Sequence, residues 1–235
     1  MKLIKASYEI LTSINFNTML TDIEKIGRIC YKSEDKITPE SSLNFIKALI
    51  KNGHEAMIEH INFSVKFICD RGISHELVRH RLCSFAQEST RYCNYSKDKF
   101  ENQLTFILPN WFKSVSVGTY EFIDNNTIIL KDGYESTFAN TYFWDIPEVI
   151  WLRHMLWSEK FYLKCLDDWK AQEARSLLPN SLKTEIIMSA NLREWRHFFK
   201  LRVAKEAHPQ MQELTRPLLD ELKLKIPIIF DDIIY

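Results

Sequence analysis

The chain of 235 residues carries 31 basic and 31 acidic side chains, and its formal net charge at pH 7 is zero. Hydrophobic residues make up 46% and aromatic residues 13%, which argues against a disordered chain and indicates one large globular domain or two small ones. The neutral balance argues against broad electrostatic binding to nucleic acid, although it leaves room for a local basic pocket.

Two further features of the composition bear on location. No apolar run approaches the length needed to span a bilayer, and Lys5 and Ser7 interrupt the apolar residues at the start of the chain. The five cysteines are an odd number and form no Cys-x-x-Cys pair. We therefore expect a cytoplasmic protein that has no membrane partner and holds reduced, mostly buried thiols.

The first half of the chain is predicted to contain both strands and helices. The expected elements are a strand over residues 2–11, a helix over 17–33, a helix over 38–53, a half-buried strand over 61–70 and, over 71–85, a turn at Gly72 followed by a helix. Thr21 offers an alternative cap for a shorter first helix. In the second helix, Thr38 precedes Pro39 at the start and Gly53 stands at the end.

The second half of the chain continues this mixture. The expected elements are a short strand over 103–109, a hairpin-like excursion over 111–143, one long helix over 145–179, a strand over 182–191, and helices over 192–207 and 209–223. Pro147 and Pro179 mark the two ends of the long helix. The pattern predicts the α+β class, with helices packed on an antiparallel-rich sheet. We expect a single domain over 1–235, with an inserted excursion around 111–143.

The glycines argue against two kinds of nucleotide site. None is spaced as in the Gly-x-Gly-x-x-Gly fingerprint of a Rossmann site or in a P-loop, as their positions show: Gly27, Gly53, Gly72, Gly118 and Gly133. If the protein binds a ligand that carries phosphate, side chains have to hold that phosphate.

The histidines do not have the spacing of a zinc helix. A zinc pair on a helix needs two histidines four residues apart, so that both imidazoles point the same way. His54 and His60 are six residues apart, and His75 and His80 are five apart. A separation of five places side chains about 140° apart around a helix. We expect no bound metal.

A covalent nucleophile is also poorly supported. Cys83 lies in a basic segment, where a lowered pKa is conceivable, but half-buried thiols of this kind usually belong to the core. Ser89 has a hydroxyl group and a nearby arginine, but no histidine lies at a spacing that identifies it as the base.

Anion recognition remains as the chemistry that the most unusual segment indicates. The stretch "RHRLCSFAQESTRY" contains Arg79, His80, Arg81 and Arg91, and only Glu88 opposes them in charge. Such a cluster repels itself unless an anion or a partner surface lies among its members. On a helix the first three side chains diverge, and each guanidinium suits bidentate binding of phosphate.

Hydroxyl groups and further basic residues favour the same interpretation. Ser89 and Thr90, expected in the turn after the helix, add hydroxyl and backbone N–H donors. Other basic positions that favour a pocket are Arg175, Arg193, Arg196, His197 and Arg202. The alternative is an arginine-rich helix face that is paired with acidic residues elsewhere.

The same segment resembles the signature of a known family. "RHRLCSFAQES", in which seven residues separate Arg81 from Ser89, is similar to the RHRx7S signature of the flavin-dependent thymidylate synthases. The following "STRY", the segment "NGHEAMIEHINFSVKF" and the block "ARSLLPNSLKTEIIMSANLREWRHFFKLR" also resemble that family. Arg175 and Arg202 are separated by 27 positions, which is the spacing expected there. The similarity covers most of residues 40–215.

The resemblance implies a reductive methylation of dUMP to dTMP in a single catalytic domain. 5,10-Methylenetetrahydrofolate would give the carbon, NADPH the reducing equivalents, and FAD would relay the hydride without a Rossmann loop. The uracil would be activated by polarisation, without attack by an enzyme nucleophile. The family forms homotetramers in which each active site draws residues from several subunits. Clustered arginines without matching acids in one chain would fit such shared sites.

The resemblance also implies roles for individual residues. Arg202 would be catalytic, since it would contact the pyrimidine and favour ionisation at N3. The residues implied to bind or line the dUMP site are Glu76, Leu77, Val78, Arg79, Gln87, Glu88, Ser89, Thr90, Arg91, Arg175 and Arg202. Those implied to lie against FAD are His54, Ala56, Arg79, His80, Arg81, Gln87, Asn191, Leu192, Arg193 and His197.

The sequence departs from the family pattern at two positions. Ala86 stands where many relatives have asparagine, which puts one flavin contact in doubt, and Glu206 stands where some members have histidine.

The alternative from a different class of function is a nucleic-acid-binding module. In this alternative the stacking groups would be Tyr92, Tyr95, Trp195 and Phe199. The neutral net charge and the lack of a continuous basic stripe argue against it, so we expect no nucleic-acid partner.

Overall fold

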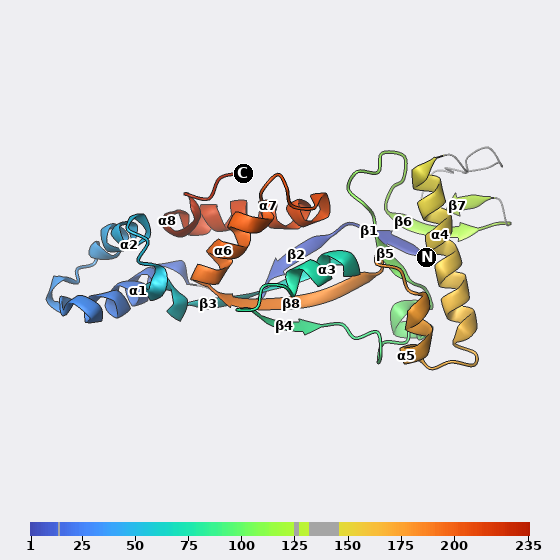
Figure 1. Ribbon diagram of the computed structural model, residues 1–235, viewed down its shortest axis with the longest axis horizontal. Helices are drawn as coiled ribbons and strands as arrows, with labels where there is room; N and C mark the ends of the chain where they lie inside the picture. The colour runs from blue at the N-terminus through green and yellow to red at the C-terminus, as the bar shows by residue number, and fades with distance from the viewer. Residues whose placement is uncertain (14, 125–126, 132–145) are drawn as a thin grey trace. The chain divides into compact units, whose positions relative to one another are not determined.

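The computed structural model describes residues 1–13, 15–124, 127–131 and 146–235 (Figure 1). The chain divides into two compact units, each of which is assembled from three stretches of sequence. Unit 1 consists of Met1–Ser7, Ile68–Glu76 and Gln87–Ile186. Unit 2 consists of Tyr8–Phe67, Leu77–Ala86 and Ile187–Tyr235.

Unit 1 contains a sheet with the strand order β5-β1-β6-β7. Its elements are β1 (Lys2–Ile4), α3 (Arg71–Leu77, whose last residue belongs to unit 2), η3 (Asp98–Phe100), β5 (Thr105–Ile107), β6 (Gly118–Phe122), β7 (Ile128–Leu130), α4 (Pro147–Cys165), α5 (Ala171–Ala174) and η5 (Arg175–Leu177). Strand β1 pairs in parallel with β5 and antiparallel with β6, which pairs antiparallel with β7. Helix α4 contacts β6.

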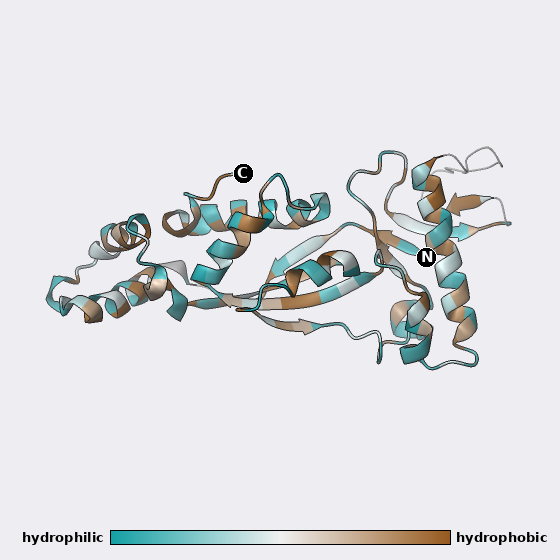
Figure 2. Cartoon of the chain, in the orientation of Figure 1, coloured by the Kyte–Doolittle hydropathy of each residue, from teal (hydrophilic) through white to brown (hydrophobic). Residues whose placement is uncertain are grey.

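The core of unit 1 lies between this sheet and α4. Phe106 of β5, Tyr120 of β6 and Leu152 of α4 are all completely buried. Brown and teal segments follow one another along α4 in Figure 2, because apolar and polar residues share that helix. The buried Tyr120 hydroxyl donates to the carbonyl oxygen of Ser116 at 3.0 Å, so its polar atom has a partner.

Most helices of unit 2 come from the N-terminal third and the C-terminal third of the chain. The remaining elements are β2 (Ser7–Ile10), α1 (Phe16–Tyr31), η1 (Glu34–Lys36), α2 (Ser41–Lys51), η2 (Glu55–His60), β3 (Asn62–Asp70), β4 (Ser84–Gln87), β8 (Lys183–Asn191), α6 (Leu192–Arg202), α7 (Pro209–Lys225) and α8 (Pro227–Phe230). The strand order of the second sheet is β2-β3-β8-β4. A unit boundary falls inside each of these four strands and inside α3.

An aromatic cluster forms the core of unit 2. Phe63 of β3 stacks on Trp195 of α6 with ring centroids 4.7 Å apart. Phe198 meets Trp195 edge-on, and Phe199 meets Phe230 of α8 in the same way. These contacts fix α6 against β3, which matters because α6 carries much of the candidate site.

Arg196 is a deeply buried charged side chain in the core of this unit. Its guanidinium forms two 2.7 Å hydrogen bonds with the carboxylate of Asp232, which hold the pKa of that carboxyl below its usual range. It also donates to Glu55 at 3.1 Å and to the carbonyl oxygen of Ile229. Arg196 therefore joins α6 to η2 and to the C-terminal segment. The sequence had suggested that Arg196 belongs to an anion pocket. In the structure its guanidinium is instead engaged by Asp232 and Glu55.

Several sequence predictions are confirmed by these elements. The strand predicted over 61–70 is β3, and the one predicted over 182–191 is β8; in both strands buried and less buried residues alternate. The strand predicted over 103–109 is β5. The helices predicted over 17–33 and 38–53 are α1 and α2, so the shorter first helix that would begin at Thr21 is wrong.

Five predicted elements differ from the structure. Residues 2–11 form two strands, 71–85 contain a helix that already includes Gly72 and ends at Leu77, and 145–179 contain two helices, α4 and α5, separated by a turn. The C-terminal helix pair is α6 and α7, of which α6 ends five residues early and α7 continues to Lys225. The excursion includes the antiparallel hairpin of β6 and β7; its residues 125–126 and 132–143 lie outside the described residues.

The cysteines agree with the prediction in their redox state but not in their burial. All five cysteines are free thiols, as predicted, but only Cys69 is fully buried and Cys30 is exposed, so the prediction of mostly buried thiols is wrong. None of the helices in the described part of the chain has the length and apolarity that crossing a bilayer requires.

Candidate active site

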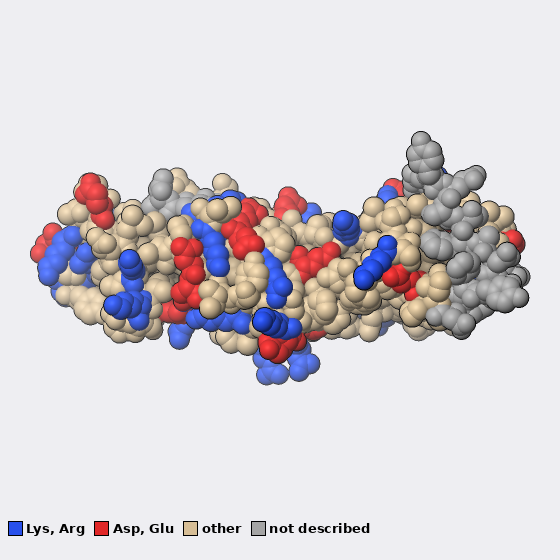
Figure 3. All heavy atoms as spheres, turned by 90° about the horizontal axis from the view of Figure 1, so that it is seen from above, with Lys and Arg blue, Asp and Glu red and all other residues tan. Residues whose placement is uncertain are grey.

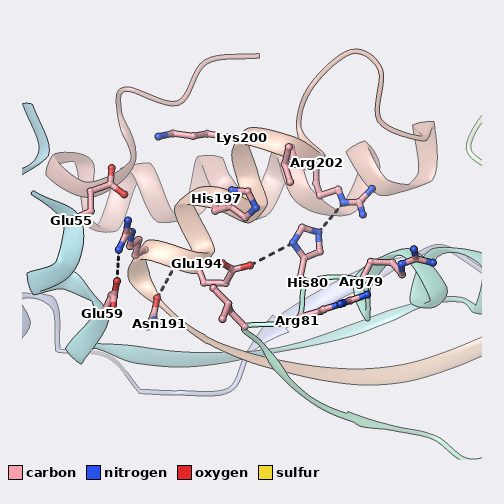
Figure 4. A pocket seen from close by; sticks show the side chains of 13 residues that line it. Glu55, Glu59, Arg79, His80, Arg81, Asn191, Glu194, His197, Lys200 and Arg202 are labelled. Carbon is pink, nitrogen blue, oxygen red and sulfur yellow. Dashed lines mark hydrogen bonds and ion pairs between the residues drawn. The ribbon is translucent and has the colours of Figure 1, made fainter. Parts of the chain in front are cut away.

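A cavity of about 860 Å³ lies within unit 2 (Figure 4). Three segments line it: η2, the turn that follows α3, and α6. The lining residues are Glu55, Glu59, Arg79, His80, Arg81, Leu82, Asn191, Arg193, Glu194, His197, Lys200, Leu201 and Arg202. Six of the residues that the sequence implied for FAD are among them, together with Arg202. A volume in this range suits a cofactor or a similarly sized ligand.

The RHR motif lies in a turn and not on a helix. The N–H of His80 donates to the carbonyl oxygen of Leu77 at 3.1 Å, and the N–H of Cys83 donates to that of His80 at 3.1 Å. Arg79 and Arg81 are exposed, whereas His80 between them is buried. The turn therefore sends the imidazole inward and leaves both guanidinium groups at the cavity.

A side-chain cap fixes the start of α6. The Asn191 side-chain oxygen accepts a hydrogen bond from the N–H of Glu194 at 2.9 Å, which is the usual contact of an N-cap residue. Leu192 and Trp195 are buried on the core side of the helix. Because the opposite side of α6 is fixed in the core, Glu194 and His197 face the cavity.

His80 and Arg202 form the central polar contact of the cavity. The Nε of Arg202 donates to Nε2 of His80 at 3.0 Å. Burial, and then the positive charges of Arg202 and His197, lower the pKa of His80 to about 4. Near neutral pH the imidazole is therefore uncharged and can accept from the guanidinium.

The cavity also contains three groups that could serve as metal ligands. One ligand atom each from His80, Glu194 and His197 lies within 4.8 Å of the others. The histidine spacings in the sequence do not reveal this group, because they test only pairs along a single helix. Since Nε2 of His80 accepts from Arg202, a metal would have to bind Nδ1, and Nε2 would then need a proton facing the Arg202 N–H. This conflict disfavours a metal, and its absence stays a prediction.

The expectation that the arginines have no acidic partners within the chain is wrong for two of them. Glu59 contacts Nη1 of Arg193 at 2.5 Å, and Glu55 pairs with the buried Arg196 at 3.0 Å. Arg79 and Arg81 differ, because neither has an acidic partner among the residues that the structure describes. The cavity therefore mixes paired and unpaired guanidinium groups.

The hydroxyl-bearing part of the motif belongs to unit 1, together with Glu76, Gln87 and Arg175. Gln87 lies at the end of β4 and donates to Oγ of Ser74 at 2.8 Å and to Oγ1 of Thr184 at 3.3 Å. Ser89 begins the next turn, where its carbonyl oxygen accepts from the N–H groups of two following residues. Thr90 is buried.

Two charged residues of this segment have quite different surroundings. The Arg91 guanidinium lies over the ring of Tyr92, 5.5 Å from its centroid, and both side chains are exposed. Glu88 instead accepts from the Tyr95 hydroxyl at 2.8 Å and from Lys183 at 3.1 Å. Glu88 is therefore neutralised within unit 1 and faces a second cavity, of about 180 Å³.

The other residues that the resemblance implied for the binding sites differ in their exposure. Leu77 and Leu192 are completely buried in the core, so only their backbone atoms are available to a ligand. Val78 and Ala56 are exposed, and Nδ1 of the exposed His54 lies 3.4 Å from the Tyr31 hydroxyl.

Sequence reasoning missed several residues that line the cavity. They are Glu55, Glu59, Leu82, Glu194, Lys200 and Leu201. A signal existed for Glu194, which stands three residues after an asparagine at the start of a helix and so occupies the third position after a cap.

Cys83 is a poor nucleophile in this environment. Its Sγ lies 3.9 Å from Oε1 of Glu194, and burial followed by that carboxylate raises the pKa of the thiol to about 12. A nucleophilic thiol needs the opposite shift. We expect Cys83→Ala to retain at least about half of the wild-type turnover, since no thiolate is available near pH 8. Steady-state turnover at matched flavin content checks this, and complete loss in a folded variant would restore the thiol mechanism.

Comparisons with known proteins identify the family of the chain. A family model described as "Thymidylate synthase complementing protein" matches residues 14–228. The flavin-dependent thymidylate synthase of Corynebacterium aurimucosum is 30% identical over 219 residues, which cover 89% of this chain and 78% of that protein.

Solved structures share the fold. A UMP/dUMP methylase of Streptomyces cacaoi, bound with 5-Br dUMP, aligns with a TM-score of 0.71 at 19% identity and covers 98% of this chain and 96% of that chain. Thymidylate synthase X of Helicobacter pylori, with FAD and dUMP, aligns with a TM-score of 0.67 at 19% identity and covers 97% of this chain and 98% of that chain. The predicted α+β fold class is confirmed. The chain belongs to the family of flavin-dependent thymidylate synthases.

Proposed function

We propose that this chain converts dUMP to dTMP by reductive methylation. 5,10-Methylenetetrahydrofolate supplies the carbon, NADPH supplies the reducing equivalents, and FAD relays the hydride. The observation that carries the proposal is the arginine-lined cavity of unit 2 in a chain of this family, because it gathers Arg79, Arg81, Arg193 and Arg202.

The residues of this cavity fit a flavin dinucleotide. Arg79 and Arg81 offer unpaired guanidinium forks to a diphosphate, and Arg193 offers a third that exchanges its partner Glu59. The cavity has room for a cofactor of this size. When bound, FAD supplies the hydride chemistry that no side chain can provide. The full cofactor-binding set proposed is His54, Ala56, Arg79, His80, Arg81, Gln87, Asn191, Leu192, Arg193 and His197.

The proposed dUMP-binding residues are divided between the units. Leu77, Val78, Arg79 and Arg202 belong to unit 2, and the others, Glu76, Gln87, Glu88, Ser89, Thr90, Arg91 and Arg175, belong to unit 1. Hydroxyl groups and guanidinium forks are the donors that a nucleotide monophosphate needs. We propose that both units form one catalytic domain and that the active chain is a homotetramer whose sites share residues from several subunits.

Arg202 is the proposed catalytic residue. Its guanidinium is permanently charged and is oriented by the 3.0 Å contact with His80. A fixed positive charge at the pyrimidine favours ionisation at N3 and raises electron density at the carbon to be methylated. The high pKa of Cys83 agrees with activation by polarisation and without a covalent nucleophile.

The nucleic-acid alternative loses its stacking groups. Trp195 and Phe199 are completely buried and Tyr95 is nearly so, which leaves only Tyr92 exposed. On the face shown in Figure 3, basic and acidic groups are mixed, and the basic ones do not gather into a stripe. A reduced compartment such as the cytoplasm is the proposed location, since all five cysteines are free thiols.

The test of this proposal measures colour and turnover together. The purified protein, reconstituted with FAD where necessary, is expected to be yellow and to bleach with NADPH under anaerobic conditions. Tritium release from 5-labelled dUMP is expected only when NADPH and methylenetetrahydrofolate are both present. Omission of each co-substrate in turn is the control. A protein that stays colourless with added FAD and releases no tritium would refute the proposed function.

A further inference from the structure

The contact between Arg202 and His80 determines where the imidazole carries its proton. Arginine has only N–H donors and stays protonated in proteins, so Nε2 of His80 must present a lone pair to the Arg202 Nε at 3.0 Å. A neutral imidazole has one N–H, and here it has to be on Nδ1. The tautomer therefore follows from the identity of the partner.

A carboxylate faces that Nδ1 atom. Oε1 of Glu194 lies 3.6 Å from Nδ1 of His80, and the two side chains are only 7% and 5% exposed. This separation is slightly longer than a hydrogen bond, and it makes the carboxylate a buried acidic group that faces Nδ1. Figure 4 shows His80 between Glu194 and Arg202.

The neighbouring groups hold this arrangement in place. The ring of Phe198 meets the His80 ring edge-on at 5.0 Å, and His197 meets it in the same manner at 6.2 Å. Glu194 is held by the Asn191 cap at the start of α6. At the end of the same helix, the carbonyl oxygen of Arg202 accepts from Oγ1 of Thr215 at 3.0 Å.

We propose that Glu194 is a positioning residue for Arg202, which acts by holding His80 in the Nδ1–H tautomer. In this role Glu194 acts through His80 and not on the reacting atoms. It gives the Nδ1 proton a buried acceptor, so that Nε2 remains free to accept from the guanidinium and to aim it. The inference rests on the proposed function of Arg202. What it requires of residue 194 is a hydrogen-bond acceptor, not a negative charge.

Loss of that acceptor changes the balance between tautomers. A buried N–H without a partner is unfavourable, so the Nε2–H tautomer gains population when the acceptor is removed. Its N–H then points at the N–H of Arg202, and the guanidinium loses its orientation. A displacement of this kind at a catalytic group costs about tenfold to a hundredfold in turnover.

The test reads the tautomer directly. ¹⁵N-histidine-labelled full-length protein is measured by magic-angle-spinning NMR, in which the two tautomers have distinct nitrogen shifts, and His80→Gln identifies the His80 signal by difference. The wild type is expected to show Nδ1–H. Glu194→Gln, whose amide oxygen still accepts, is expected to keep this tautomer and most of the turnover. Glu194→Leu is expected to gain Nε2–H and to lose about tenfold to a hundredfold in kcat at unchanged flavin content.

Cys83→Ala is the matched control, since its thiol touches the same Glu194 oxygen without touching the imidazole. This variant is expected to keep the wild-type tautomer. An Nε2–H or doubly protonated His80 in the wild type overturns the proposal, even if Glu194→Leu does not fold. So does a Glu194→Leu protein with wild-type tautomer and kcat. The tautomer is measured without substrates, so failure of the proposed function, seen as absent tritium release, is distinguishable.

Discussion

Replacing Arg202 by alanine is expected to lower dTMP formation by at least about a hundredfold while the flavin content stays close to that of the wild type. The reason is the permanent charge of the guanidinium, which His80 orients at 3.0 Å and which no other described side chain contacting His80 supplies. Arg202 is half-buried at the end of α6, so its removal does not disturb the aromatic core. Single-turnover formation of dTMP by the flavin-loaded protein measures the effect.

Two variants sharpen this result. Arg202→Lys keeps a positive charge but loses the planar fork and its Nε, so most of the activity is expected to be lost here too. Lys205→Ala removes an exposed charge just beyond α6, outside the cavity, and should leave turnover unchanged. Normal dTMP formation by Arg202→Ala would show that the uracil is activated by some other group.

Replacing Arg196 by leucine is expected to destabilise the protein by about 3 kcal/mol. Removal of one member of a buried ion pair costs about 3–5 kcal/mol, and the lower end applies because Asp232 is 48% exposed and can regain water. Glu55, which is 18% exposed, loses its partner at the same time. Urea unfolding followed by circular dichroism measures the change in the free energy of unfolding.

Arg193 gives the matched comparison on the same helix. It also pairs with a glutamate, but the two side chains are 54% and 42% exposed. Arg193→Leu is expected to change the free energy of unfolding by no more than about 1 kcal/mol, since water and salt screen such a pair. Equal effects of the two substitutions would mean that burial of Arg196 does not determine its contribution.

The sequence predicted those elements whose pattern directly reflects burial. Along β3, Phe63, Val65 and Phe67 are buried, as the alternation of apolar residues required. Helix α2 ends where Gly53 follows with a φ of 70°, a backbone conformation that glycine adopts without strain. Here local sequence and tertiary structure make the same demand.

Other boundaries depend on contacts that no local pattern contains. Helix α3 ends at Leu77 because the following residues turn to place His80 against α6, and Arg202 is 122 positions away in sequence. The interruption after Cys165 begins with "LDDW", where two aspartates disfavour a continued helix and the Trp169 N–H closes a turn on the Cys165 carbonyl at 2.7 Å.

The candidate site was predictable in its arginines and histidines but not in its acids. The motif and its family resemblance identified Arg79, His80 and Arg81. Glu59 gave no such signal, since its pairing with Arg193 spans 134 positions and depends on how η2 meets α6. Charge clusters in a sequence reveal where like charges concentrate, but not which opposite charges the fold brings to them.

The Glu59–Arg193 pair gives the cavity a resident counter-ion. An incoming anion at Arg193 displaces an internal carboxylate, so that step releases fewer mobile salt ions than binding at a bare guanidinium. The affinity for an anionic ligand should therefore fall less steeply with ionic strength than the number of arginines implies. The displaced carboxylate also becomes available to a cationic or hydrogen-donating part of the same ligand.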